Sequence, residues 1–109
     1  MSINTDAVLQ TTLDRSKELA ATLFGRFTEQ AASDTQAFLQ RSKAGIARAT
    51  ALLAAKQIDQ RDFEDLILGK KDLFEMHALK QVGLANATID AFIDGVLQIL
   101  LDAVSAAIA

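Results

Sequence analysis

The sequence predicts an all-α protein. The chain of 109 residues contains no proline and five glycines, and apolar residues recur at helical spacing over nearly its whole length. Half of the residues are hydrophobic, which is enough apolar material for one compact core. We expect a single helical domain over residues 1–109, in which a long amphipathic N-terminal helix packs with a C-terminal helical hairpin as a three- to four-helix bundle.

The first expected element is a long amphipathic helix, or a pair of helices, over residues 6–56. Its apolar residues fall within an arc of about 120° on a helical wheel. One series recurs every eleven residues and includes Leu9, Ala20, Ala31 and Leu53. An eleven-residue period favours a nearly straight or slightly right-handed helix pair, or a helix lying on an apolar surface. An ordinary core-facing helix whose stripe keeps its phase is the simpler interpretation.

A possible break in this element lies at Ser33. Ser33 and Gln36 fit the N-cap and N3 positions of a capping box, and Asp34 falls on the apolar stripe, where a buried carboxylate is unfavourable. No glycine or proline marks a turn at this point. We therefore expect the helix to continue through Ser33, with a bend or a break as the alternative.

The second expected helix covers residues 60–82. Asp59 fits its N-cap, and Gly83 suits the left-handed position that follows a last helical turn. Gly69 lies inside the helix and predicts a kink or a tight turn, with Asp72 as the cap of a second short helix.

The third expected helix covers residues 87–108 and is strongly apolar. Asp90, Asp94, Gln98 and Asp102 recur every four residues and form one acidic ribbon. The apolar residues occupy an arc of roughly 200°, which is wider than the stripe of a typical surface helix. This pattern predicts a helix with contacts on two sides: the centre of the bundle, the seam of an oligomer, or a segment that enters a lipid or polymer boundary.

We expect the protein to be oligomeric. Twenty residues are alanine, which favours helix but buries little area, so the core is thin for a monomer. The residues expected at an interface lie on the last helix and on the aromatic positions of the first element: Phe92, Ile93, Val96, Leu97, Leu100, Leu101, Val104 and Ile108, with Phe24, Phe27 and Phe38.

The sequence shows no pattern that is typical of catalysis. Cysteine is absent, and the single histidine, His77, has no second histidine at a metal-binding spacing. The glycines occur singly, so they do not form a phosphate-binding loop. We expect no catalytic residues, no cofactor and no metal site, and therefore a protein that is not an enzyme.

Charge is unevenly distributed along the chain. The net charge of −3 and the pI near 5.0 argue against nucleic-acid binding. Residues 1–56 carry seven basic and five acidic residues, residues 57–82 carry four and six, and residues 83–109 carry three aspartates and no basic residue. The basic first half and the acidic last helix can complement each other, within one chain or between neighbouring chains, or they can be two solvated faces.

The best candidate for an anion-binding patch is formed by Arg41, Lys43 and Arg48. Arg41 and Arg48 are two turns apart on one helix face and flank the apolar stripe. The alternative is that these long basic side chains cover the stripe with their methylene groups.

The N-terminal segment lacks the basic region and apolar run of a secretory signal. Aspartates interrupt the most apolar segment before it reaches the roughly 18–20 uninterrupted residues of a membrane span. We expect no transmembrane span and a cytoplasmic location, with export without a cleavable signal left open.

These observations predict a non-enzymatic structural or protein–protein interaction module. It self-assembles, or binds a helical protein partner, through apolar helix faces. The alternative is a peripheral binder of a membrane, lipid or storage-polymer surface through amphipathic helices. A small enzyme or a ligand-binding bundle is a third class.

Overall fold

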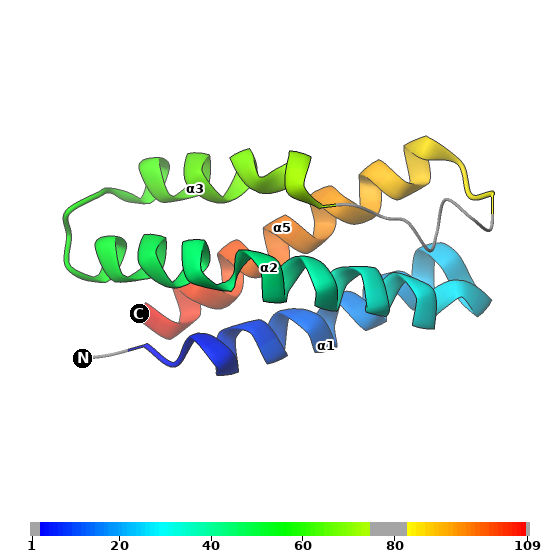
Figure 1. Ribbon diagram of the computed structural model, residues 1–109, viewed down its shortest axis with the longest axis horizontal. Coiled ribbons are helices and arrows are strands. Elements are labelled where there is room, and N and C mark those ends of the chain that lie inside the picture. Colours follow the sequence, from blue (N-terminus) through cyan, green and yellow to red (C-terminus); the bar gives the residue numbers. More distant parts are fainter. Residues whose placement is uncertain (1–2, 75–82, 109) are drawn as a thin grey trace.

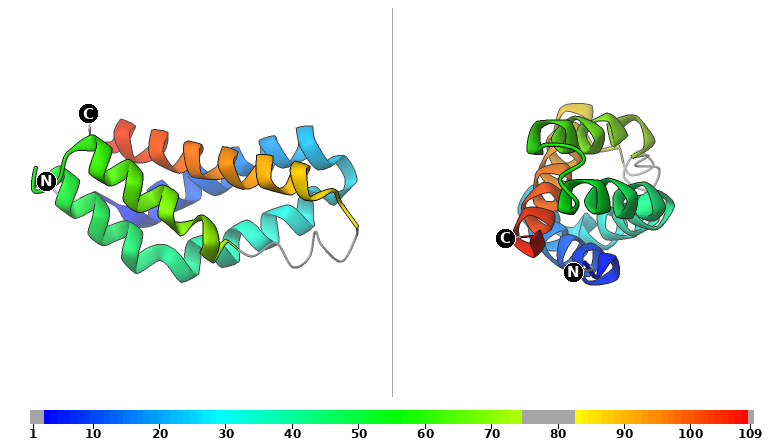
Figure 2. Two further views of the ribbon diagram at one scale, coloured as in Figure 1. Left: turned by 90° about the horizontal axis from the view of Figure 1, so that it is seen from above. Right: turned by 90° about the vertical axis from the view of Figure 1, so that its left-hand side faces the viewer.

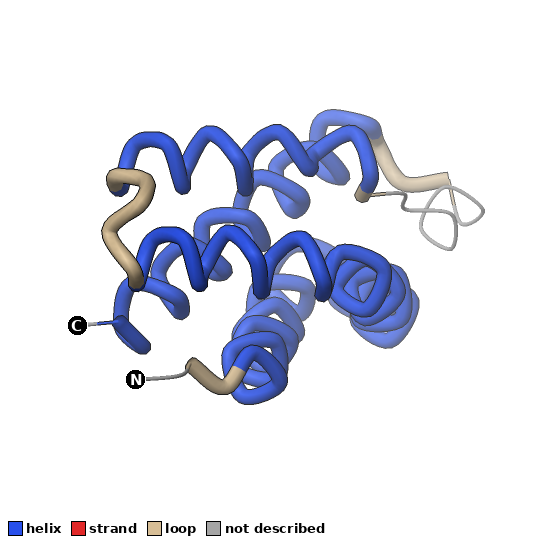
Figure 3. The backbone as a smooth tube through the Cα atoms, turned by 60° about the vertical axis from the view of Figure 1, so that its left-hand side comes forward, coloured by secondary structure: helices blue, strands red, loops and turns tan. Residues whose placement is uncertain are grey.

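The computed structural model describes residues 3–74 and 83–108, and within these ranges the protein is all-α. The elements are α1 (Thr5–Phe24), the 3₁₀-helix η1 (Gly25–Phe27), α2 (Thr28–Ala54), α3 (Gln60–Leu68), the 3₁₀-helix η2 (Gly69–Leu73) and α5 (Asn86–Ile108). The tube view shows helices joined by short connections in the described part of the chain, with both ends of the chain at the same end of the molecule (Figure 3).

The helices lie side by side along an elongated body with extents of 43 × 22 × 20 Å, and each runs opposite in direction to the one before it (Figure 1). Helix α1 packs extensively against both α2 and α5, and α3 also contacts both of them. Contacts between α2 and α5 are sparse by comparison. The end-on view in Figure 2 accordingly shows α2 and α5 on opposite sides of the molecule, with α1 and α3 between them.

The first helical segment is not continuous, and the break does not lie at Ser33. The chain turns at Gly25, whose φ of +55° lies in the left-handed region that favours glycine. The Gly25 N–H donates to the Ala21 carbonyl, and the Thr28 hydroxyl donates to the Gly25 carbonyl. Ser33 lies inside α2. The apolar stripe keeps its phase across the turn because both helices face the same core, so continuity of the stripe is no proof of one helix.

The start of α3 confirms the predicted cap. The Asp62 N–H donates to Asp59 Oδ1 at 2.8 Å, and the Asp59 N–H donates to Asp62 Oδ2 at 3.3 Å, which completes a capping box. The helix begins at Gln60, as expected, but it does not run on as one α-helix. It ends at Leu68, and the chain then forms η2.

Gly69 begins η2, so the irregularity that its position predicts is present. Asp72 lies within η2 and does not cap a new helix, and Phe74 has extended backbone angles. The predicted C-terminal part of this helix, up to residue 82, lies outside the described residues. Gly83 has a φ of +76°, which confirms the left-handed conformation predicted for it.

A cluster of phenylalanines joins the helices at the end of the molecule where α1 meets α2. The rings of Phe38 and Phe74 stack with centroids 4.3 Å apart. Phe92 of α5 contacts Phe24 and Phe74 edge to face, with centroids 5.1 and 6.4 Å apart. Edge-to-face and offset-stacked arrangements are the favourable ones for aromatic pairs. Phe74 therefore ties the end of η2 to both α2 and α5.

Helices α1 and α2 bury hydroxyl groups as well as apolar side chains. Thr12, Ser16, Thr35 and Thr50 are 0–3% exposed, and each hydroxyl donates to the backbone carbonyl four residues earlier, at 2.6–2.8 Å. Ser42 is 5% exposed, and its hydroxyl has no hydrogen-bond partner within the described structure.

Candidate interaction surface

The apolar residues predicted at an interface lie in the interior of the single chain. Helix α5 buries nearly all of its predicted residues, and Phe24 and Phe38 are buried as well, whereas Phe27 and Ile108 are partly buried against the same core. These side chains fill the core of one chain and present little apolar surface to a second chain. Their predicted role between chains stays a prediction, and the exposed surface has to be searched separately.

Helix α5 is long and apolar enough to cross a bilayer by length and composition, and it is the helix among the described residues that meets this criterion. The core helix of a globular protein meets it equally well. In this structure α5 packs along α1, and most of its apolar residues from Ile89 to Val104 are buried, whereas Ile99 is partly exposed.

Exposed large apolar side chains are concentrated on one short segment. Among the described residues they are Leu66, Leu68 and Leu73, which are 48%, 47% and 56% exposed. All three lie on the end of α3 or on η2. Single exposed leucines are ordinary on a protein surface. Three within eight residues make this segment a local apolar patch, in which Leu66 and Leu68 face different sides of α3 because they lie two positions apart.

A groove of about 350 Å³ adjoins this patch, between α2 and α3. Its apolar lining comes from Ala49, Leu52 and Leu66, and its polar lining comes from Arg48 and Lys70, with the bare backbone of Gly45 between them. We call it the basic groove. Within the described part of the chain, neither Arg48 nor Lys70 forms an ion pair. The groove therefore offers two unpaired positive charges beside an apolar floor.

Gly45 allows the Lys70 side chain to lie across α2. A Cβ placed at position 45 would lie 2.5 Å from Lys70 Nζ, so any other residue would push the ammonium group away. Glycine in a helix interior costs roughly 1 kcal/mol relative to alanine. Among the described residues, the Lys70 side chain is the group that lies close to this position. No other packing contact there offsets the cost of the glycine.

The predicted anion patch is divided in the structure. Lys43 Nζ lies 2.6 Å from Asp6 Oδ1 and so points toward α1. Arg48 points to the other side of α2 and lines the basic groove with Lys70. Arg41 is exposed and has an interaction of its own. The structure thus pairs Arg48 with a residue from the next helix and separates it from Lys43.

The acidic ribbon of α5 is exposed, as its four-residue spacing predicts. Asp90, Asp94, Gln98 and Asp102 all lie on the solvent side of the helix, and Gln98 Nε2 donates to Asp102 Oδ1 at 3.1 Å. Asp94 Oδ1 lies 2.9 Å from Lys71 Nζ. This contact raises the pKa of the Lys71 ammonium above its ordinary value of 10.5.

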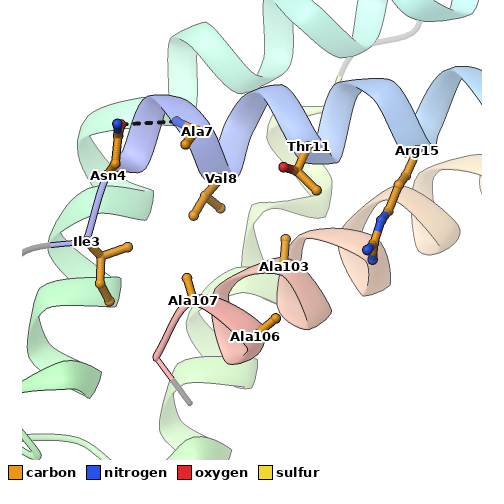
Figure 4. A pocket seen from close by; sticks show the side chains of 9 residues that line it. All are labelled: Ile3, Asn4, Ala7, Val8, Thr11, Arg15, Ala103, Ala106 and Ala107. Carbon is orange, nitrogen blue, oxygen red and sulfur yellow. Dashed lines mark hydrogen bonds between the residues drawn. The ribbon is translucent and has the colours of Figure 1, made fainter.

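A second groove, of about 400 Å³, lies between the start of α1 and the end of α5 (Figure 4). Its floor is made of small apolar side chains, and Arg15 extends from α1 toward α5 at one end of it. The lining residues are Ile3, Asn4, Ala7, Val8, Thr11, Arg15, Ala103, Ala106 and Ala107. This groove is lined by one cation and by none of the exposed leucines. It therefore has fewer features of an interaction site than the basic groove has.

The apolar pattern of the sequence does not predict Leu66 and Lys70 as parts of this surface. Gly45 was the available signal, since a lone glycine inside a helical pattern often marks a close approach of another group. The pattern gave no indication of which group would approach. The predicted absence of a metal site stays a prediction, and the described residues hold no group of three metal-binding side chains. His77 lies outside the described residues.

Comparisons with protein-family models, with curated proteins and with solved structures find no match to this chain.

Proposed function

We propose that this protein is a non-enzymatic interaction module that binds a protein partner, another copy of itself included, through the surface formed by the basic groove and the exposed leucines of α3 and η2. The observation that carries the proposal is the half-exposed Leu66 in the lining of that groove, with Leu68 and Leu73 exposed on the same segment of the chain. The core of the chain is already filled from within, so this segment is where apolar area remains to be buried.

The composition of the surface supports a protein partner. Interfaces typically combine a central apolar patch with a polar rim, and arginine is enriched in them. Here Leu52 and Leu66 form the apolar part, and Arg48 and Lys70 form the rim.

The test uses the full chain as bait, with the variant Leu66→Ser/Leu73→Ser and the matched surface variant Gln57→Ser as control. Association is measured by sedimentation velocity over a hundredfold concentration range and by quantitative co-purification. We expect the wild type and the Gln57→Ser control to associate with themselves or with a common partner, and the double variant to lose that association while its melting temperature stays close to that of the wild type.

Equal behaviour of all three baits in both measurements would contradict the proposal. A double variant that unfolds would instead show that the leucines support the core, and the single variant Leu73→Ser, at the most exposed of the three positions, would then decide the question.

A second candidate function is peripheral binding to a lipid or polymer surface. It is favoured by the same exposed leucines, because Lys70 and Lys71 lie beside them, and apolar residues flanked by lysines are typical of segments that bind at membrane interfaces. Flotation with vesicles of phosphatidylcholine and phosphatidylserine tests it. Recovery of the wild type, but not of Leu73→Ser, in the floating fraction would support this function, and an empty floating fraction would contradict it for lipids.

A further inference from the structure

We infer that the partner that fits the basic groove is a second copy of this chain, which inserts the acidic ribbon of its α5. This inference rests on the proposed function and names the occupant. Because groove and ribbon lie on different faces of one molecule, the resulting contact is head to tail.

Charge complementarity supports this occupant. The groove presents Arg48 and Lys70, and no described residue forms an ion pair with either of them. On the ribbon, Asp90 and Asp102 are exposed and are likewise without an ion pair within the described structure. Residues 83–109 contain no basic residue, and Lys71 of η2, a cation that lies on the ribbon, is paired with Asp94. Complementary potentials of this kind fix the register of a contact and accelerate association.

The two surfaces lie on different elements of one molecule, the groove between α2 and α3 and the ribbon on α5. Helices α2 and α5 lie on opposite sides of the end-on view and have few contacts with each other (Figure 2). A contact between different faces of identical chains is heterologous, and it produces open-ended chains of molecules unless a rotation closes them into a ring. We therefore expect the mass of the assemblies to increase with concentration rather than to stop at a dimer.

The test uses two variants that each disable one surface. Lys70→Glu reverses a charge in the groove, and Asp90→Lys/Asp102→Lys reverses two charges on the ribbon. Lys17→Glu and Glu18→Lys make the same kinds of change at exposed positions of α1 and serve as matched controls. Circular dichroism melting shows that each variant is folded before its association is measured.

Sedimentation velocity of the wild type is expected to show assemblies that grow with concentration and shrink when NaCl is raised from about 0.05 to 0.5 M, because salt screens exposed charges. Each disabling variant alone is expected to weaken self-association about tenfold or more, and the controls are expected to behave as the wild type. An equimolar mixture of the two disabling variants is expected to recover association, because the intact groove of one variant meets the intact ribbon of the other, and the two reversed surfaces again carry opposite charges.

The variant Gly45→Ala tests the groove without changing any charge. The added methyl group displaces the Lys70 ammonium, whose position depends on the bare backbone at Gly45. Alanine in place of a helical glycine is expected to raise the melting temperature by a few degrees while self-association weakens. A stabilised variant that associates like the wild type would overturn the assignment of Lys70.

A wild type that stays monomeric over the whole concentration range would overturn the inference of a second copy, and the co-purification experiment would still decide the proposed function by itself. Association that the charge reversals leave unchanged would also overturn it, as would a wild type that stops at a dimer. Both of the latter results leave the proposed interaction module standing with a different contact.

Discussion

Helices α1 and α2 build their buried faces differently from α5. The buried polar residues of the described structure are Thr12, Ser16, Asp34, Thr35, Ser42 and Thr50, and all of them lie on α1 and α2. Helix α5 buries apolar residues, among them Phe92, Leu97 and Leu100, which have no exposed surface. The first pair of helices therefore combines large buried side chains such as Phe38 with small ones and locally bonded hydroxyls, whereas the buried face of α5 is apolar throughout.

A helix core can be filled by small residues and hydroxyls that bond to their own helix, or by large apolar side chains. A buried hydroxyl is costly unless it finds a partner, and a threonine or serine in a helix finds one in the carbonyl four residues earlier. Such residues can face another helix without a partner from that helix. Small buried residues such as Ala20 and Ala31 let the backbones approach closely, while large side chains such as Phe38 of α2 and Leu100 of α5 supply buried apolar area.

The largest expected effect comes from truncating a large side chain of α5. Leu100 is fully buried, so Leu100→Ala removes apolar contacts and leaves a cavity. We expect the free energy of unfolding to fall by about 2–5 kcal/mol, as measured by urea denaturation. Leu66→Ala makes the same chemical change at a position that is 48% exposed, and we expect a loss below about 1 kcal/mol. Equal losses at the two positions would contradict the assignment of Leu100 to the core.

On α1 and α2, we expect enlargement of a small buried residue to be damaging. Ala31 has no exposed surface, so Ala31→Leu has to push the neighbouring helix away. Overpacking of this kind costs about 1–3 kcal/mol. Ala44→Leu is the matched control, because Ala44 is exposed on the same helix. If thermal melting shows no loss for Ala31→Leu, the buried face of α2 is looser than the structure indicates.

Replacing buried serines of α1 and α2 by alanine distinguishes a hydroxyl that has no hydrogen-bond partner from one that has a partner. The hydroxyl of Ser42 is buried without a partner in the described structure, so Ser42→Ala is expected to stabilise the protein by about 0.5–1 kcal/mol. The hydroxyl of Ser16 donates to the Thr12 carbonyl at 2.6 Å, so Ser16→Ala, the same substitution, is expected to be neutral or to cost up to about 1 kcal/mol. Urea denaturation of both variants gives the sign of the change in the free energy of unfolding. If Ser16→Ala stabilised the protein and Ser42→Ala did not, the assignment of the Ser42 hydroxyl as the unpaired one would be wrong.

This comparison also explains how far the sequence predicts the fold. Apolar periodicity located α5 almost to the residue, because its buried face is made of large apolar side chains, and the cap at Asp59 was predicted for a similarly local reason. The turn at Gly25 was missed, since the stripe of apolar residues continues in phase on both sides of it.

The candidate surface was less predictable than the fold. Arg48 was identified as part of a basic patch, but its neighbour Lys70 comes from another helix, 22 positions further along the chain. That proximity depends on how α3 folds back against α2. A pattern read along one helix contains no information about it.

The smallest expected effect concerns the ion pair between η2 and α5. Lys71 and Asp94 have side chains that are 43% and 61% exposed, so their attraction is screened by water, and Asp94→Asn is expected to leave the melting temperature at pH 7 nearly unchanged.

The titration of Lys71 is the more sensitive observable. Its pKa is raised by the hydrogen bond to Asp94, so any stabilisation from this pair is fully present below the ordinary lysine pKa of 10.5 and is lost as the pH rises through the raised value. NMR titration of the Lys71 side chain should show the pKa falling toward its ordinary value in Asp94→Asn, whereas the control Asp102→Asn should leave it unchanged. An unaltered pKa in Asp94→Asn would mean that this contact is not held in solution.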